Sequence, residues 1–467
     1  MAVFIYLSLI FLIIFVELSR KKYFTFDFMT SFNFFFLISY AITPLILVSS
    51  DNPFKFFAKD MIKGVYYYGL SSTPYLIAAA YLAFLAGYYN KFFRSRLPIL
   101  IIEPKFDEKA IIRLSPIFVL TLSFLLFVYI MQFGGVKEAL MAAEAYRGGD
   151  YEPPKYGFVQ RFFPANTVLL YYSYYKYFLD KECKNKTPFL FLFIFSFSFF
   201  IFLFFLFNSR GYLIIILGGM YLITSIVNKR YYITQVLILS IVGILIIQVG
   251  DPLFYALPDL IDNGWDSFVI TFTDIIKEEE QTTGGFEEFV SNFTHPVVSL
   301  DLSLQRSGFD IPFRYLSDLW ISILSLLPDK LVGFKDPLSV SNINTILNKG
   351  VLKGTVLVGI LGYFSYALGV IGVILGMFFY GVLGGYLSRF FYQNAKFNKT
   401  VLVFAYFFIF YYGYFVFRGD PKITLQELFI LLFIIFVILI FSKIYIQNPT
   451  LDDSNKIVLS KSGEKGI

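Results

Sequence analysis

The chain has 467 residues, of which 57% are hydrophobic and only 15% are charged, and its formal net charge is +6. Soluble domains carry about a quarter charged residues, so this composition excludes a water-soluble fold. One cysteine and one histidine exclude an intrachain disulfide and argue against a histidine-built metal site. We therefore expect neither a metal nor a cofactor.

Apolar runs of a length suited to crossing a membrane recur along the chain. In chain order they cover residues 2–18, 28–49, 66–89, 111–132, 162–179, 187–207, 211–227, 232–249, 354–387, 400–416 and 423–442. A crossing helix needs roughly 20 such residues. The run at 354–387 is too long for one untilted helix, and we expect an interfacial or re-entrant piece in it. The pattern predicts an all-α polytopic membrane protein with about eleven transmembrane helices, in a range of roughly 10 to 13.

Basic residues gather in every second connecting segment. Examples are Arg20, Lys21 and Lys22 after the first run, Lys181, Lys184 and Lys186 after the fifth, and Lys443 after the last. By the positive-inside rule these segments are cytoplasmic. The N-terminus is then outside and the C-terminus inside. The surplus of positive charge belongs to these loops, so we expect no nucleic-acid partner.

The topology divides the chain into four parts. Residues 1–249 form transmembrane helices 1–8, 250–353 form one long extracytoplasmic loop, 354–446 form helices 9–11, and 447–467 form a polar, disordered cytoplasmic tail. The loop is acidic, with 15 Asp or Glu against 6 Lys or Arg between Asp251 and Lys349. We expect it to be partly helical, with an interfacial helix over 315–327 that Pro328 ends.

Glycines recur in the ninth predicted helix at spacings of three and four. Gly372 with Gly376, and Gly381 with Gly385, are small-xxx-small pairs on one helix face. Such pairs allow helices to approach closely. We interpret them as packing positions rather than as a gate.

Arginines lie near the outer ends of the later predicted helices, against the usual sorting of positive charge. They are Arg147, Arg161, Arg210, Arg306, Arg314 and Arg418. The planar guanidinium matches phosphate oxygens, so an outward arginine set suits a lipid-linked pyrophosphate. The alternative is that each pairs locally, as Arg418 with Asp420 or Arg147 with Asp150, or reaches lipid headgroups.

Three short patterns carry these arginines. Gly134-Gly135 precedes a short helical stretch that ends in Tyr146-Arg147-Gly148-Gly149, Asn208-Ser209-Arg210-Gly211 forms a tight turn, and Phe417-Arg418-Gly419-Asp420 forms the last outer turn. The sequence holds no Walker A motif, no dinucleotide-binding glycine loop, and no D-x-D pair in a cytoplasmic loop. A soluble nucleotide-sugar donor is therefore not expected.

In the order of these patterns, the long outer loop and the glycine-rich ninth helix, the chain resembles the Wzy-type O-antigen, or oligosaccharide repeat-unit, polymerases. The resemblance implies a bacterial glycosyltransferase of the cytoplasmic (inner) membrane with a GT-C-like architecture. It would move a growing glycan from undecaprenyl pyrophosphate onto the newest lipid-linked repeat unit. It also implies a flippase and a chain-length regulator as partners, besides membrane lipids.

The chain departs from the family in two places. Some members have Arg, ten residues and then Gly, whereas nine residues separate Arg147 from Gly157 here. The related O-antigen ligases use a loop histidine, but the sequence around His295 does not match their pattern.

The resemblance and the chemistry together assign candidate roles. Arg210 and Arg418 are the predicted catalytic residues and bind the pyrophosphate, because preorganised positive charge stabilises a developing anion. The predicted substrate-binding residues are Arg147, Arg161, Arg314 and Tyr146. Tyr146 would stack on a sugar face, although an interfacial belt position is the alternative. Asp251 or Asp301 is the candidate acceptor base.

Three rival functions remain at this stage. A flippase or transporter for lipid-linked oligosaccharides predicts internal repeats and charges deep within helices. An O-antigen ligase predicts the histidine pattern that is missing. A structural membrane protein leaves the outward arginines without a role.

Overall fold

The computed structural model describes residues 1–57, 72–104, 108–148, 157–207, 210–282, 285–308, 310–327, 338–352, 355–440 and 442–447. Several predicted features lie outside these ranges: Gly149 and Asp150, the turn residues Asn208 and Ser209, Pro328, and the tail over 448–467. Most of the described chain is helical.

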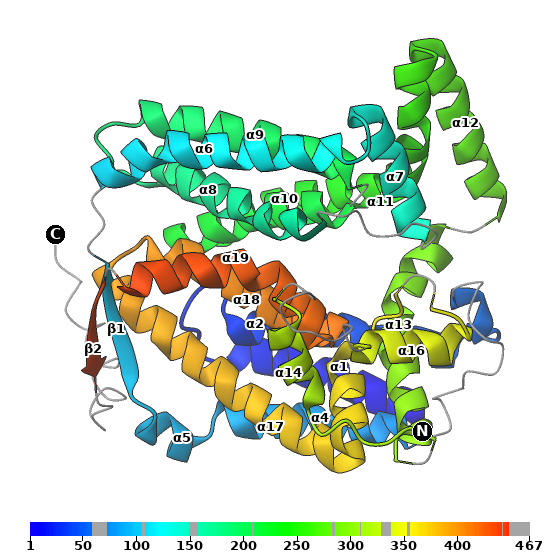
Figure 1. Cartoon of the computed structure of the whole chain (residues 1–467). Helices are drawn as coiled ribbons and strands as arrows, with labels where there is room; N and C mark the ends of the chain where they lie inside the picture. Colours follow the sequence, from blue (N-terminus) through cyan, green and yellow to red (C-terminus); the bar gives the residue numbers. More distant parts are fainter. Residues whose placement is uncertain are drawn as a thin grey trace.

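Seven helical stretches among the described residues are long and apolar enough to cross a membrane. They are Ala2–Ser19, Phe28–Ser49, Thr73–Arg96, Ile111–Met131, Thr187–Leu206, Gly359–Phe397 and Val401–Arg418. In the labels of Figure 1, they correspond to α1 (Ala2–Ser19), α2 (Phe28–Leu37) with η1 (Ile38–Ile42) and α3 (Thr43–Ser49), α4 (Thr73–Tyr88) with α5 (Lys91–Arg96), α6 (Glu108–Met131), α9 (Thr187–Leu206), α17 (Gly359–Phe397) and α18 (Val401–Arg418). The chain is thus a multi-pass α-helical membrane protein.

Further helices complete the described fold. They are η2 (Pro53–Phe56), α7 (Val136–Gly148), η3 (Gly157–Phe162), α8 (Pro164–Tyr174), η4 (Tyr175–Leu179), α10 (Arg210–Asn228), α11 (Ile233–Asp262), α12 (Trp265–Thr282), α13 (Gly285–Arg306), α14 (Ser317–Leu324), α16 (Val340–Lys349) and α19 (Pro421–Ile440). One antiparallel pair of strands, β1 (Ile99–Pro104) and β2 (Ser442–Gln447), joins the chain after α5 to the chain after α19. The sequence analysis did not anticipate this pair.

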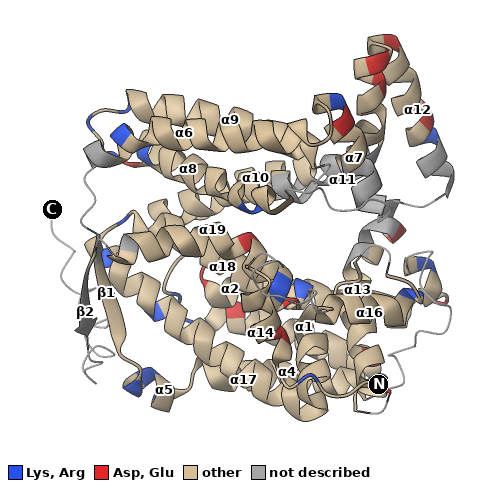
Figure 2. Cartoon of the chain, in the orientation of Figure 1, with Lys and Arg blue, Asp and Glu red and all other residues tan. Residues whose placement is uncertain are grey.

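The helices form two groups that lie side by side in Figure 1. α6, α8, α9 and α10 run together in the upper group, and α17, α18 and α19 run with α1, α2 and α4 in the lower group. The N-terminus lies at the right of the view, with α13 and α16, and the two strands lie at the left. Figure 2 shows charged residues at these two ends, on α12, which projects from the bundle, and in the middle of the view around α14 and α19.

Aromatic packing holds the lower group together. The rings of Phe32 and Phe84 stack with centroids 3.5 Å apart, and Tyr380 stacks on Tyr412 at 4.3 Å. α4 approaches α17 so closely that a Cβ at Gly381 would overlap the backbone oxygen of Phe84. This contact confirms the packing interpretation of the glycines.

The long run predicted at 354–387 forms a broken helix. Within α17, Leu368 and Gly369 have non-helical backbone angles, and Gly369 has a φ of +64°. The positive φ suits glycine, because other residues pay a steric cost there. A short helical piece thus precedes the longer one, in agreement with the expected extra piece.

The segment predicted as an external loop is largely helical. α11 continues through Gly250, with Pro252 and Pro258 inside it, to Asp262. α12, α13, α14 and α16 follow within 250–353. The helix expected over 315–327 appears as α14, which begins two residues later and is shorter.

Candidate functional site where α14, α18 and α19 meet

The turn that carries Arg418 has a fixed shape. α18 ends at Arg418, and Gly419 closes the helix with a φ of +65° and a hydrogen bond from its N–H to the Phe415 carbonyl at 2.8 Å. A Cβ at Gly419 would overlap the backbone of Gly359. Only glycine combines a favourable positive φ with the absence of a Cβ. The position of Arg418 is therefore set by the backbone on either side of it.

Arg418 is a mostly buried cation with an unused hydrogen-bond donor. Its side chain is 16% exposed, and its Nη1 lies 2.6 Å from a carboxylate oxygen of Glu427 on α19. Its guanidinium also lies 5.1 Å from the centre of the Tyr414 ring. With Nη1 directed at Glu427, Nε is the guanidinium donor that has no acceptor in the described part of the chain. A guanidinium held in this way is ready to donate to an incoming anion.

Asp420 has a different role from the local ion pair considered as an alternative. It is fully buried, and it accepts hydrogen bonds from the Ser339 hydroxyl at 2.8 Å and the Lys422 N–H at 2.8 Å. The described ion pair of Arg418 is with Glu427. Asp420 therefore caps α19 and ties it to the start of α16.

Arg314 fastens the start of α14. Its guanidinium pairs with Asp318, with contacts of 2.5 and 2.8 Å, and donates to the Leu338 carbonyl at 3.1 Å. Asp318 in turn accepts from the Val340 N–H at 2.9 Å. Leu316, immediately before α14, has a left-handed φ of +64°, so this tight turn is stabilised by the ion pair and its hydrogen bonds.

Arg161 fastens the other end of α14. From η3 it donates to the carbonyls of Ser325 and Leu326 at 2.9 and 3.3 Å. These carbonyls lie just beyond the C-terminus of the helix, where positive charge is favourable. Gln426 of α19 donates to the Ser325 hydroxyl at 3.3 Å. The structure thus brings Arg161, Arg314 and Arg418 to a common framework of α14 and α19.

The remaining predicted residues do not join this framework in the described structure. Arg147 and Tyr146 lie in α7 and Arg210 begins α10, but the side chains of all three lie outside the described parts, as does that of Asp251. Asp301 is buried in α13, where its carboxylate accepts from the Thr73 hydroxyl at 2.6 Å. These contacts neither bring Asp301 to Arg418 nor place it on a substrate.

Glu427 is the functional candidate that the sequence analysis missed. It is the only charged residue between 423 and 442. A single charged residue in an apolar membrane helix is costly and marks a functional or paired position. A search of each apolar run for a single charged residue would have identified Glu427.

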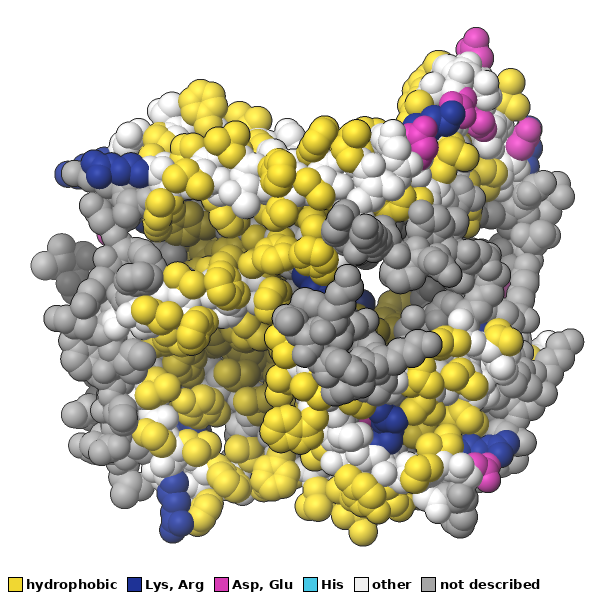
Figure 3. All heavy atoms as spheres, viewed as in Figure 1, with side chains coloured by type: hydrophobic (Ala, Val, Ile, Leu, Met, Phe, Trp, Pro, Cys, Tyr) yellow, Lys and Arg dark blue, Asp and Glu magenta, His cyan; other side chains and the backbone are white. Residues whose placement is uncertain are grey.

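Figure 3 shows apolar side chains over most of the visible face, with a hollow between the upper group of helices and the group of α17 and α19. Lys and Arg side chains are visible at the inner end of this hollow. Within the described residues, no group of three or more His, Cys, Asp or Glu is placed to hold a metal ion.

Comparison of the chain with protein-family models, with curated proteins and with solved structures gives no match in any of the three.

Proposed function

We propose that this protein polymerises lipid-linked oligosaccharide repeat units at the outer face of a bacterial cytoplasmic membrane. The donor is a glycan on undecaprenyl pyrophosphate, and the product is an O-antigen, capsular or extracellular polysaccharide. In this proposal α8 with η4, α10, α11 and α19 cross the membrane as well as the seven stretches named above. They complete the eleven predicted crossings, with the N-terminus outside and the C-terminus in the cytoplasm.

The observation that carries the proposal is the state of Arg418. A mostly buried guanidinium with an open donor beside one glutamate is suited to a ligand that brings negative charge. If no ligand ever bound there, the unpaired donor would only lower the free energy of unfolding. A pyrophosphate supplies negative charge and an acceptor oxygen for Nε, and it can take the place of Glu427 at Nη1.

The proposed reaction is a glycosyl transfer. The acceptor hydroxyl of the newest repeat unit forms a bond to the anomeric carbon of the growing glycan, and the bond from that carbon to the pyrophosphate oxygen breaks. Undecaprenyl pyrophosphate leaves with the electron pair, and the acceptor proton passes to a carboxylate. Arg418 stabilises the charge that develops on the leaving group.

Glu427 takes two roles in this scheme. With Arg418 unliganded it neutralises the guanidinium, and its side chain is 35% exposed, so it is reachable by a substrate. When the pyrophosphate occupies Arg418, Glu427 becomes available to accept the acceptor proton. Asp251 and Asp301 remain candidate bases. Glu427 is added to them because its carboxylate contacts the proposed catalytic arginine.

Arg161 and Arg314 act as positioning residues. Their described donors are directed to the protein itself, and they hold both ends of α14 against α19. Arg210 remains the second proposed contact of the leaving pyrophosphate, and Arg147 and Tyr146 remain the proposed contacts of the second lipid-linked substrate and of a sugar. The apolar hollow in Figure 3 offers a path for a polyisoprenyl chain to approach from the membrane.

Deletion and restoration of the gene, followed by a glycan ladder gel of the cell surface, tests this function. The proposal predicts that deletion reduces the ladder to a single repeat unit and that restoration rebuilds it. Loss of polymer with no single-repeat species at the surface would favour the flippase. Accumulation of full-length polymer on its lipid carrier would favour the ligase, and an unchanged ladder would refute all three.

A further inference from the structure

A second polar pocket lies far from Arg418. It has a volume of about 310 Å³, and its walls come from the segment after α1, the junction of α4 with α5, and the last part of α17. α17 and α18 are consecutive and pack together, so the end of α17 lies near the start of α18. Phe391 of α17, beside the pocket residues, packs against Phe408 of α18, and the ten residues from Phe408 to Arg418 span about 15 Å of helix, which separates the pocket from Arg418 along α18.

The pocket is strongly cationic. Five of its lining residues are Lys or Arg and none is Asp or Glu; the five are Arg20, Lys21, Lys22, Arg94 and Arg389. Asp27 and Glu17, which lie outside the lining, neutralise Arg20 and Lys22. Within the described part of the chain, the other three cations have no ion-pair partner.

Arg389 is the cation that most clearly lacks a counter-charge. It is 9% exposed, and its described hydrogen bonds go to the backbone carbonyls of Arg94 and Gly385. Arg94 itself donates to the Tyr23 hydroxyl at 2.8 Å. Two arginines thus share one pocket without a carboxylate. Burial of such charge is unfavourable unless an anion completes the site.

Tyrosines supply further donors around the same space. Five of them line the pocket: Tyr23, Tyr88, Tyr89, Tyr386 and Tyr392. Burial raises the pKa of Tyr23, although Arg94 and Arg389 oppose this effect, so its hydroxyl stays protonated and able to donate. Guanidinium and hydroxyl donors together match the oxygens of a phosphate group.

Two glycines build the pocket wall. A Cβ at Gly87 would overlap the backbone of Phe378, and a Cβ at Gly385 would lie 2.8 Å from the Tyr88 carbonyl oxygen. The close approach of α4 and α17 therefore depends on these positions. It places the backbone that carries Arg389 beside the backbone that leads to Arg94.

The position of the pocket favours a lipid as the source of the anion. Eight of its lining residues follow closely after Ser19 or Tyr88, the last residues of α1 and α4. α5 lies at the edge of the molecule beside α17 (Figure 1), and on it the exposed Phe92 ring packs against Arg96 at 4.0 Å. Aromatic and basic residues of this kind gather where helices leave the membrane, at the depth of lipid phosphates.

We propose that this pocket binds the phosphate group of an anionic lipid, on the face that the sequence predicts to be cytoplasmic. The bound lipid would hold the ends of α1, α4 and α17 together. This site is separate from the proposed glycosyl-transfer site and does not depend on that function.

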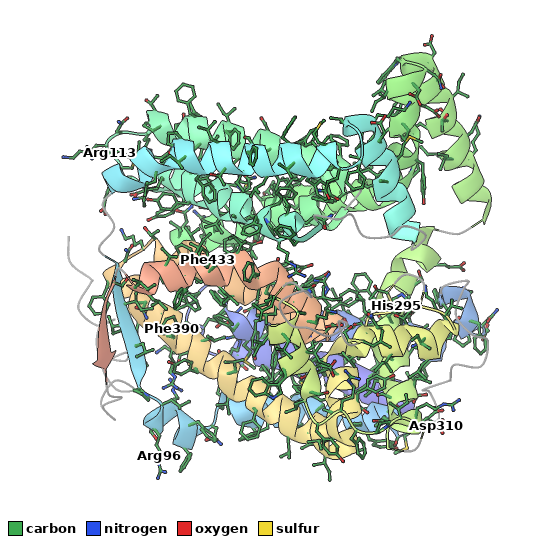
Figure 4. All side chains as sticks on the ribbon, in the orientation of Figure 1. Arg96, Arg113, His295, Asp310, Phe390 and Phe433 are labelled. Atoms are coloured by element: carbon green, nitrogen blue, oxygen red, sulfur yellow. The ribbon has the colours of Figure 1, made fainter. Side chains whose placement is uncertain are left out.

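The test measures lipid binding to the purified full chain by native mass spectrometry and by thermal stability in micelles. The probes are phosphatidic acid, phosphatidylcholine and inorganic phosphate. The variants are Arg94→Gln and Arg389→Gln. The matched control is Arg96→Gln, since Arg96 is exposed on the same short helix, does not line the pocket and points outward in Figure 4.

Phosphatidic acid should bind more tightly than phosphatidylcholine, and Arg94→Gln should weaken that binding about tenfold. Arg389→Gln should do the same, while Arg96→Gln should bind like the unmodified chain. If inorganic phosphate alone stabilises the protein with the same dependence on Arg94, the phosphate site stands and its ligand is soluble. Equal binding by all three variants, or no preference for phosphatidic acid, would overturn the proposal. Because Arg94 is exposed, its variant still gives a result if Arg389→Gln fails to fold.

Discussion

Asp27 shows how a single residue makes a buried charge tolerable in this protein. It is fully buried, and its two carboxylate oxygens each accept from Arg20 at 2.7 Å. It also caps α2 by accepting from the Thr30 N–H at 3.0 Å. Asp27 thus neutralises Arg20, accepts from both arms of its guanidinium and caps a helix at the same time. Arg418 and Arg389 lack such a fully satisfied arrangement.

The substitution Asp27→Asn keeps the size and the capping oxygen but removes the charge. Arg20 would then rely on Glu17 alone, and we expect a loss of about 3 kcal/mol in the free energy of unfolding. Thermal unfolding of the purified protein in micelles would show it as a lower midpoint. Asp310→Asn is the control, because the pair of Asp310 with Arg306 is exposed and is worth little. Equal midpoints for the two variants would contradict this account.

At the scale of the helix, the contact of α4 with α17 depends on glycine. Gly381 faces the Phe84 backbone oxygen and the Tyr88 nitrogen, and a side chain there would overlap both. Backbone atoms cannot move aside as a flexible side chain can. The two helices must therefore separate to admit even a methyl group.

Gly381→Ala should accordingly destabilise the protein by about 1–3 kcal/mol. The matched control is Gly218→Ala in α10, where no atom lies within 4 Å of the added Cβ. That change should be neutral or should stabilise by up to about 1 kcal/mol, since alanine favours the helix. Unfolding midpoints of the two variants give the comparison, and a destabilised Gly218→Ala with an unaffected Gly381→Ala would refute the packing argument.

The sequence was sufficient to predict the helical membrane class, the broken long helix and the role of the glycines. These features follow from hydropathy and spacing, which are local. The partner of Arg418 was not predictable in the same way, because Asp420 is nearer in sequence while Glu427 is brought close by the turn at Gly419. The extent of α11 beyond Gly250 was also missed, because the apolar pattern fades there although the helix continues through two prolines.

At the scale of the whole molecule, the proposed function requires that the Arg418 end of α18 faces outward. Asp310 and Arg96 are labelled at opposite ends of the lower group in Figure 4. Both are exposed. They are suitable positions for testing the predicted orientation.

In a background in which the only cysteine is removed by Cys183→Ala, we expect Asp310→Cys to react with a membrane-impermeant maleimide on intact cells. Arg96→Cys should react only after the membrane is opened. The reason is the positive-inside rule, which assigns the basic α5 to the cytoplasm. The reverse pattern would mean that the membrane topology is inverted and that Arg418 does not lie at the outer face.

The central claim is that Arg418 binds the leaving pyrophosphate, and polymer synthesis by Arg418 variants tests it most directly. Purified protein in proteoliposomes would receive lipid-linked repeat units, and the length and amount of glycan would be measured. We expect Arg418→Ala to lower the rate of polymer formation at least about a hundredfold, and Arg418→Lys to restore only part of it, because lysine lacks the planar fork. Arg306→Ala, at an exposed pair, should make a normal ladder. A normal ladder from Arg418→Ala at equal protein amount would contradict the assignment.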